Sequence, residues 1–221
     1  MNFADWGVID YLDAWKQQEA IFNTMIEQKR NGLSPHPSET IVFCEHPHVY
    51  TLGRSGNKQN LLVSEESLKN SQVSFYHIDR GGDITYHGPG QIVVYPIIDL
   101  EHHQLSLKSY IYKMEEAIIK TVEEFGVKAS RLDGATGVWV DANNDTARKI
   151  CAIGVKASRF VTMHGFALNV NTDLTFFTKI NPCGFTTKGV TSLEKESGNK
   201  IEIKNVKKAL RENLYDTLFH S

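Results

Sequence analysis

The chain has 221 residues, of which 41% are hydrophobic and 23% are charged, and its formal net charge is −2 at pH 7. This composition is ordinary for a globular protein and gives no reason to expect nucleic acid as a partner. No apolar run approaches the roughly 18 residues of a membrane-spanning helix, and the three cysteines, an odd and low count, argue against a disulfide framework.

The first hundred residues predict mainly strands, with one long helix near the start. A short strand over Phe3–Ile9 leads into a helix that Asp10 caps and Asn31-Gly32 ends. The beginning of the chain is acidic and lacks the basic region of a secretory signal, so we expect a cytoplasmic protein, or one already processed. Further predicted elements are strands at 41–44, 49–52, 73–78 and 92–98, a loop at 33–40 and a helical turn or two at 64–70.

The stretch Arg80–Gln91 contains four glycines and one proline, which excludes the middle of a helix. We predict a tight backbone loop here, entered by one strand and left by another. Glycines let a backbone approach another surface closely, and Thr85, Tyr86, His87 and Gln91 can form hydrogen bonds. The stretch therefore predicts one wall of a ligand pocket. The alternative is a glycine-rich hairpin around a buried histidine.

The second half of the chain predicts strands in runs, with helices between them. Ser106 caps the clearest helix, which ends at Gly126. The other predicted elements are strands at 137–141, 149–155 and 160–170, a short helix at 174–180 and a final helix within about 201–221. That last helix either forms a small subdomain or folds back on the first helix. The pattern indicates an α+β fold with a mixed, mostly antiparallel sheet, and we expect a single domain over 1–221.

The charge is unevenly distributed. Between Ala147 and Lys188 there are six basic residues and one acidic residue, so this segment is +5 and the remainder is −7. A local basic surface on an acidic protein favours an acidic partner. The alternative is that the charges are scattered and solvated.

Two side chains could carry nucleophilic chemistry. Pro182 and Gly184 flank Cys183, which predicts a thiol held at a loop surface. Such a thiol is mostly protonated at pH 7 and needs a base or a cation beside it. Lys149 begins an otherwise apolar strand, and a desolvated lysine could serve as that base and then as an acid. The alternatives are a structural cysteine and a solvated lysine at a strand edge, and the sequence does not show that the two residues meet.

Other reactive motifs are disfavoured. The run Cys44-Glu45-His46-Pro47-His48 looks like a metal site, but Pro47 disturbs the backbone between the histidines and no second cluster completes four ligands. The sequence contains neither a Gly-x-x-x-x-Gly-Lys-Ser/Thr phosphate loop nor a Gly-x-Ser-x-Gly motif. We therefore predict no metal in the site.

Taken together, the motifs resemble one family. Seven spaced blocks occur in the order seen in the lipoyl(octanoyl) transferases: Glu45–Gly53, Arg80–Gln91, Tyr95–Ile97, Gly137–Val140, Lys149–Gly154, His164–Asn169 and Asn181–Gly184. The resemblance runs from about Ile41 to Leu193. The departures are mild: Cys151 stands where a small residue such as alanine is usual, and Phe166 where an aliphatic one is common.

The resemblance implies the fold of the biotin/lipoate protein ligase catalytic domain. It also implies transfer of an octanoyl or lipoyl group from acyl carrier protein to a specific lysine of lipoyl domains. These acceptors belong to 2-oxoacid dehydrogenase complexes and to the glycine cleavage H protein. Neither ATP nor another cofactor is implied, and no membrane. We expect a monomer.

Carried over by position, the resemblance makes Cys183 the nucleophile that forms an acyl thioester, while Lys149 tunes and relays its proton. Backbone N–H groups near Gly165 and Cys183 are the expected oxyanion hole. The residues expected to line the acyl site are Arg80, Gly81, Gly82, Asp83, Ile84, Thr85, Tyr86, His87, Ala152, Ile153, Gly154, Gly165, Phe166 and Ala167.

Two rival functions remain at this point. An ATP-dependent lipoate or biotin ligase of the same fold would activate a free acid as an adenylate and would not need Cys183. A non-catalytic module would bind the carrier or the lipoyl domain without moving the acyl group. The presence of both Cys183 and Lys149 favours the transferase.

Overall fold

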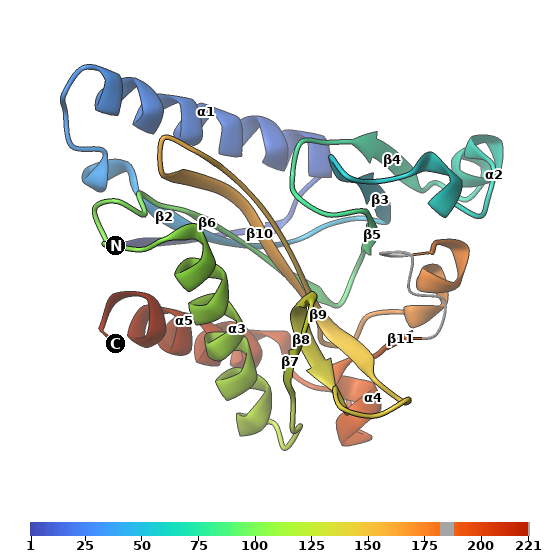
Figure 1. Ribbon diagram of the computed structural model, residues 1–221. Helices are drawn as coiled ribbons and strands as arrows, with labels where there is room; N and C mark the ends of the chain where they lie inside the picture. The colour runs from blue at the N-terminus through green and yellow to red at the C-terminus, as the bar shows by residue number, and fades with distance from the viewer. Residues whose placement is uncertain (182–187, 221) are drawn as a thin grey trace.

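An eight-stranded mixed sheet forms the centre of the computed structural model, which describes residues 1–181 and 188–220 (Figure 1). Its strands follow the order β1 (Asn2–Val8), β2 (Thr40–Glu45), β6 (Gln91–Ile97), β10 (Val161–Asn169), β9 (Arg148–Ser158), β8 (Ala135–Val140) and β7 (Ser130–Leu132), with β11 (Gly189–Val190) also beside β9. Only β1–β2 and β11–β9 are parallel among the described pairs of this sheet. The predicted mixed, mostly antiparallel sheet is confirmed.

A smaller three-stranded sheet holds β3 (Val49–Leu52) between β4 (Ser74–His77) and β5 (Ile84–His87). The prediction of a continuous loop from Arg80 to Gln91 is therefore wrong over 84–87, where β5 pairs antiparallel with β3. The glycines of this stretch lie before and after β5, and the residues between them include β-branched and aromatic side chains that suit a strand.

Helices cover both faces of the large sheet (Figure 1). On one face lies α1 (Tyr11–Arg30), whose predicted cap is confirmed because the Asp10 side chain accepts a hydrogen bond from the Leu12 N–H. On the other face lies α3 (Leu107–Glu124), which the Ser106 side chain caps at the Ser109 N–H. The shorter helices are α2 (Glu65–Asn70) and α4 (Leu193–Ser197), with 3₁₀ turns η1 (His36–Ser38), η2 (Lys58–Asn60) and η3 (Leu174–Lys179).

The final helix, α5 (Ile203–Phe219), packs against α3. The predicted placement on the first helix is wrong, because the apolar stripe that includes Val206, Leu210 and Leu214 joins the same buried cluster as α3. No helix in the described part of the chain combines the length and apolar character needed to cross a membrane.

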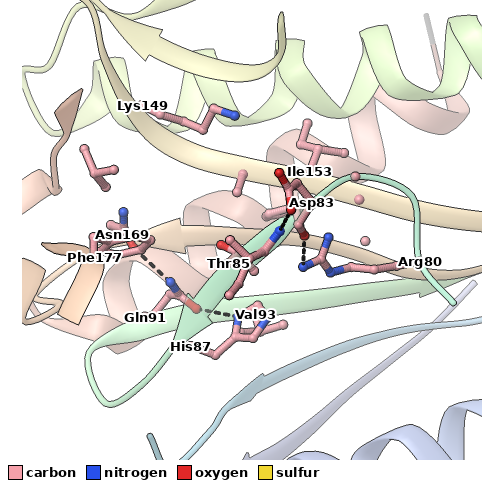
Figure 2. A pocket seen from close by; sticks show the side chains of 18 of the residues that line it. Arg80, Asp83, Thr85, His87, Gln91, Val93, Lys149, Ile153, Asn169 and Phe177 are labelled. Atoms are coloured by element: carbon pink, nitrogen blue, oxygen red, sulfur yellow. Dashed lines mark hydrogen bonds between the residues drawn. The ribbon is translucent and has the colours of Figure 1, made fainter. Parts of the chain in front are cut away.

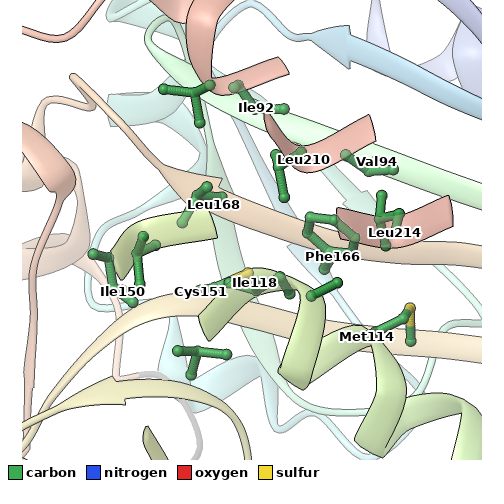
Figure 3. Packing of buried hydrophobic residues seen from close by; sticks show 14 of the residues in the cluster. Ile92, Val94, Met114, Ile118, Ile150, Cys151, Phe166, Leu168, Leu210 and Leu214 are labelled. Atoms are coloured by element: carbon green, nitrogen blue, oxygen red, sulfur yellow. The ribbon is translucent and has the colours of Figure 1, made fainter. Parts of the chain in front are cut away.

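The two sides of the core follow from strand alternation. In β6, Ile92 and Val94 face the cluster shared with α3 and α5, whereas Val93 and Tyr95 join the cluster on the α1 side. Figure 3 shows Phe166 of β10 and Leu210 and Leu214 of α5 meeting in the first of these clusters. On the α1 side of the sheet, β9 and β10 contribute the small residues Ala152, Gly154, Gly165 and Ala167, and the pocket lies next to them.

Candidate functional site

A pocket lies between the α1 side of the large sheet and the segment 80–87 (Figure 2). Twelve of the fourteen residues predicted for acyl binding line it: Arg80, Gly82, Asp83, Ile84, Thr85, His87, Ala152, Ile153, Gly154, Gly165, Phe166 and Ala167. The register explains part of this grouping, because Ala152 lies opposite Ala167 and Gly154 opposite Gly165 across β9 and β10. These four residues give one wall of the pocket a surface of small side chains.

The other two predicted residues, Gly81 and Tyr86, are not among the described residues that line this pocket. The Gly81 N–H donates to the Val155 carbonyl at 2.9 Å, so Gly81 joins the 80–87 segment to β9. The Tyr86 ring stacks on Phe176 with 4.7 Å between the ring centroids, and its hydroxyl lies 2.7 Å from His48 Nδ1. Both residues therefore support the wall without lining the pocket.

A β-bulge turns Lys149 toward the pocket. Across β8 and β9, Val138 pairs with Cys151 and Trp139 with Lys149, so Ile150 is the extra residue of the bulge. Ile150 and Cys151 are both buried in the core. Lys149 instead lines the pocket, with its Nζ 4.6 Å from the centroid of the Trp139 ring.

Arg80 holds the opposite wall in place. Its Nη2 donates to the Thr51 carbonyl at 2.8 Å and to the Asp83 carbonyl at 2.8 Å, and its Nη1 donates to the Gly81 carbonyl at 3.0 Å. The same Nη2 lies 3.0 Å from Thr51 Oγ1. Because the side chain is buried and its guanidinium meets backbone carbonyls, Arg80 organises the wall as well as lining it.

A chain of buried hydrogen bonds links this wall to the large sheet (Figure 2). His87 Nδ1 lies 2.8 Å from Gln91 Oε1, Gln91 Nε2 donates to Asn169 Oδ1 at 2.9 Å, and Asn169 Nδ2 donates to the Thr191 carbonyl at 3.0 Å. Burial lowers the pKa of His87 to about 3, so its ring is neutral at pH 7. A neutral ring facing an amide oxygen carries its proton on Nδ1.

A second polar group borders the pocket at His164. Its backbone N–H donates to Gln18 Oε1 at 3.0 Å, and its ring Nε2 lies 3.0 Å from Asp79 Oδ1. The hydrogen bond from His164, together with the nearby Lys156 ammonium, holds the pKa of Asp79 well below its usual range against the opposing effect of burial. His164 adopts a left-handed φ of +58°, which is uncommon outside glycine.

Sequence reasoning placed Gln91 in a pocket wall and Lys149 in the site, but it missed other lining residues. They are Tyr11, Val93, Tyr95, Trp139, His164, Asn169, Phe177, Lys188, Gly189 and Val190. Tyr95, Trp139, His164 and Asn169 lie within the blocks that carried the family resemblance, so a signal for them was present. Tyr11 comes from the distant helix α1, and only the tertiary fold brings it to the pocket.

The predicted nucleophile Cys183, with the oxyanion N–H groups expected near it, lies outside the described residues. The chain is described up to Asn181, whose N–H donates to the Asn60 carbonyl at 2.7 Å, and again from Lys188, which lines the pocket. Cys44 and Cys151 are buried, and burial raises the pKa of both thiols. Neither of these two thiols is therefore suited to nucleophilic attack.

His46, in the run that looked like a metal site, makes hydrogen bonds through both ring nitrogens. His46 Nδ1 lies 2.8 Å from the Ile9 carbonyl and Nε2 lies 2.7 Å from the Tyr95 hydroxyl, so both ring nitrogens have hydrogen-bond partners. Burial lowers the pKa of His46 to about 4. This histidine packs edge-on against His87, with 5.9 Å between their ring centroids, and supports the pocket wall from behind.

Solved structures that share this fold include lipoate protein ligases. The bipartite lipoate protein ligase of Thermoplasma acidophilum aligns with a TM-score of 0.70 at 16% identity, covering 98% of this chain and 83% of that one. A lipoate-protein ligase A bound with ATP aligns with a TM-score of 0.67 at 16% identity, covering 98% and 85%. At this level of identity the likeness shows the fold alone, that of the lipoate and biotin ligase catalytic domains.

Sequence comparisons narrow the class. Residues 10–215 match the family described as lipoyl protein ligase A/B catalytic domain. An octanoyltransferase of Bacteroides fragilis is 54% identical over 214 residues, covering 97% of this chain and 96% of the relative. One from Bacteroides thetaiotaomicron is 52% identical over 206 residues, covering 93% and 90%. The chain therefore belongs to the lipoyl protein ligase A/B catalytic-domain family and, within it, to the octanoyltransferases.

Proposed function

We propose that this protein transfers an octanoyl group from acyl carrier protein to a specific lysine of lipoyl domains, through a thioester on Cys183. Membership of the octanoyltransferases supports the transfer itself. The observation that carries the site assignment is the bulge that directs Lys149 into a pocket with a wall of small side chains. Val190, which follows the segment of Cys183, is the register partner of Lys149 on β9.

In the first half-reaction, the neutral Lys149 amine takes the proton of the Cys183 thiol. The thiolate attacks the donor thioester, a new S–C bond forms, and the bond to the phosphopantetheine sulfur breaks. The Lys149 ammonium then returns its proton to that departing sulfur. A cysteine intermediate suits this exchange because one difficult encounter becomes two easier ones.

In the second half-reaction, the amine of the acceptor lysine attacks the octanoyl thioester. A C–N bond forms and the bond to Cys183 breaks, while Lys149 takes a proton from the attacking amine and delivers one to the cysteine sulfur. An amide is more stable than a thioester, so the step is downhill without ATP. Backbone N–H groups near Gly165 and Cys183 would stabilise the oxyanion in both steps.

The partners follow from this assignment: octanoyl-acyl carrier protein as donor, and the lipoyl domains of 2-oxoacid dehydrogenase complexes and the glycine cleavage H protein as acceptors. An acidic carrier suits the basic 147–188 segment. Arg148 and Lys156 already pair with acidic side chains, so this docking face has fewer unpaired charges than the sequence suggests. We further propose a single catalytic domain that acts as a monomer in the reducing cytoplasm, which would keep Cys183 as a thiol.

The direct test is intact-mass analysis after incubation with octanoyl-acyl carrier protein in the absence of acceptor and ATP. We expect the mass of one octanoyl group, mapped to Cys183 and absent in Cys183→Ala. The matched control is Cys151→Ala, which changes a buried thiol to the residue usual at that position and should still be acylated.

Two outcomes would overturn the proposal in different ways. Acylation that requires free octanoate and ATP would indicate a ligase. Tight carrier binding without acyl transfer to any acceptor would indicate a non-catalytic binding module.

A further inference from the structure

Three histidines that are far apart in the sequence meet at one end of the large sheet. Thr40 of β2 pairs with Ile97 of β6, so the segment before Thr40 and the segment after Ile97 lie side by side. His36 comes from the first segment, and His102 and His103 come from the second. One ring nitrogen from each lies within 4.8 Å of the other two.

A buried carboxylate orients two of these rings. Glu39 Oε2 lies 2.6 Å from His36 Nδ1, and Glu39 Oε1 lies 3.0 Å from His103 Nε2. The Asp99 N–H donates to Glu39 Oε1 at 2.8 Å and holds the carboxylate in place. A carboxylate only accepts hydrogen bonds, so the ring nitrogens that face it carry the protons. A neutral His36 or His103 then keeps its lone pair on the nitrogen that does not face Glu39.

This arrangement is typical of the surroundings of metal-bound histidines. A ligating imidazole almost always donates its other N–H to a carboxylate, a carbonyl or water, and this contact fixes the ring and raises its basicity. Here a single glutamate, fully buried, supplies that contact to two rings. A histidine cluster formed by chance on a surface would not require a buried carboxylate behind it.

The local charge also favours a cation. Lys29 Nζ lies 2.7 Å from Asp99 and 2.8 Å from Glu101, and Glu39 accepts a hydrogen bond from the Asp99 N–H. Two carboxylates therefore contact one ammonium, with the carboxylate of Glu39 close by. A divalent cation bound to neutral imidazoles would balance the remaining negative charge.

We propose that His36, His102 and His103 bind a Zn²⁺ ion, with Glu39 as the carboxylate behind two of the ligands. Three imidazoles and a water would complete a tetrahedral site. Zn–N bonds of about 2.05 Å place tetrahedral nitrogens about 3.3 Å apart, so the rings must close inwards from their present spacing. His102 is exposed and stacks on His36 with 4.4 Å between the ring centroids, so it can turn without disturbing the core.

The site would act separately from acyl transfer. Gln91, Val93 and Tyr95 of β6 line the acyl pocket, whereas His102 and His103 follow Ile97 at the other end of that strand, and His36 precedes Thr40, which pairs with Ile97. A bound ion would tie η1 to the 99–104 segment. Since the folded chain assembles the ligands and the unfolded chain does not, Zn²⁺ should stabilise the fold.

The test is calorimetric titration of Zn²⁺ into untagged, chelator-treated full-length protein that carries Cys183→Ser, so that the predicted active-site thiol does not bind the ion. We expect one equivalent and a higher melting temperature with Zn²⁺. His102→Ala, at an exposed position, should weaken binding at least tenfold, and Glu39→Gln by about 10- to 100-fold. His77→Ala removes an exposed histidine of the smaller sheet and should change neither readout.

Three results would overturn the proposal: no Zn²⁺ binding by the Cys183→Ser protein, the same affinity in His102→Ala, or an equal loss of affinity in His77→Ala. Because Glu39 is buried, circular dichroism is used to check that Glu39→Gln folds. If Glu39→Gln does not fold, the result for His102→Ala alone decides whether the histidines bind Zn²⁺. Co²⁺ gives an independent readout, since a four-coordinate histidine site produces intense visible absorption that His102→Ala should abolish.

Discussion

The two walls of the acyl pocket are held together by different physical means. The sheet wall contains Ala152, Gly154, Gly165 and Ala167, which are placed by a regular antiparallel ladder. The opposite wall, residues 80–87, contains only one short strand, β5. Its shape depends on Arg80, which bonds three backbone carbonyls, and on the hydrogen-bond chain that begins at His87.

The difference indicates which wall is easier to disturb. A ladder distributes its stability over many backbone hydrogen bonds, so one side chain rarely decides its position. The 80–87 wall concentrates its support in a few buried polar groups, and removing one leaves others without partners. We therefore expect substitutions in the sheet wall to act mainly on chemistry or contact, and substitutions behind the other wall to act on stability.

The largest expected effect is at the end of the sheet wall, where the bulge places Lys149. Lys149→Met removes the proposed proton relay but keeps a long apolar side chain, so acylation by octanoyl-carrier protein should slow by about 10²- to 10⁴-fold. Carrier docking should change little. Single-turnover kinetics and a separate binding measurement distinguish the two effects. Lys120→Met on the exposed side of α3 is the matched control. If docking weakened as much as acylation, Lys149 would be only a binding residue.

The second effect tests the support of the 80–87 wall. Arg80→Met leaves the carbonyls of Thr51, Gly81 and Asp83 without the guanidinium that bonds them. We expect the free energy of unfolding to fall by about 3 kcal/mol in urea denaturation, since each buried unsatisfied group costs about 1–3 kcal/mol and some will find water. Arg54→Met, at an exposed arginine, should stay within about 0.5 kcal/mol of wild type. Similar stability of the two variants would show that Arg80 does not organise this wall.

The third effect is at the contact between the walls. A Cβ on Gly154 would lie 2.7 Å from the Gly81 carbonyl oxygen and 3.1 Å from Arg80 Cδ, so Gly154→Ala should push the walls apart. Such overpacking costs about 1–3 kcal/mol, and acylation should slow as well. Gly189→Ala is the stability control, because its Cβ would make an ordinary 3.4 Å contact with Arg148 Cβ. Equal stability of both variants, measured by urea denaturation, would argue against close contact between the walls.

The last effect, which is small over any one pH unit, is a dependence of stability on pH. Burial lowers the pKa of His46 to about 4, whereas an unfolded histidine titrates near 6.5. A depressed folded-state pKa means that this stability is fully present above about pH 6.5 and is lost as the pH falls towards 4. The loss should reach about 1.4 kcal/mol per pH unit for this group. Urea denaturation at several pH values should give a flatter dependence for His46→Gln, while exposed His77→Gln keeps the wild-type slope. An unchanged slope in His46→Gln would contradict the assignment.

Much of the fold could be predicted from local signals. Asp10 and Ser106 cap their helices as expected, and the β-branched run at 92–98 predicts the strand that the structure has over Gln91–Ile97. These features depend on neighbouring residues, which a single sequence displays directly. By contrast, the glycines around 84–87 concealed β5, whose pairing with β3 is not local.

The sequence could predict which residues belong to the site, but not how they are arranged in space. The motif blocks gathered most lining residues, yet spacing alone could not show that Ile150 is bulged and that Lys149 consequently faces the pocket. The meeting of His36 with His102 was equally hidden, because it follows from the pairing of β2 with β6. That Cys183 lies next to Lys149 stays a prediction.

The most direct measurement is a crystal structure of the octanoyl-enzyme, trapped with octanoyl-acyl carrier protein in the absence of acceptor. The account predicts an acyl chain attached to Cys183 that extends between the Ala152–Gly154 strand and the 80–87 wall, with Lys149 Nζ about 3 Å from the cysteine sulfur or the thioester oxygen. Density for the chain elsewhere, or a Lys149 amine on the far side of the pocket from the thioester, would contradict it.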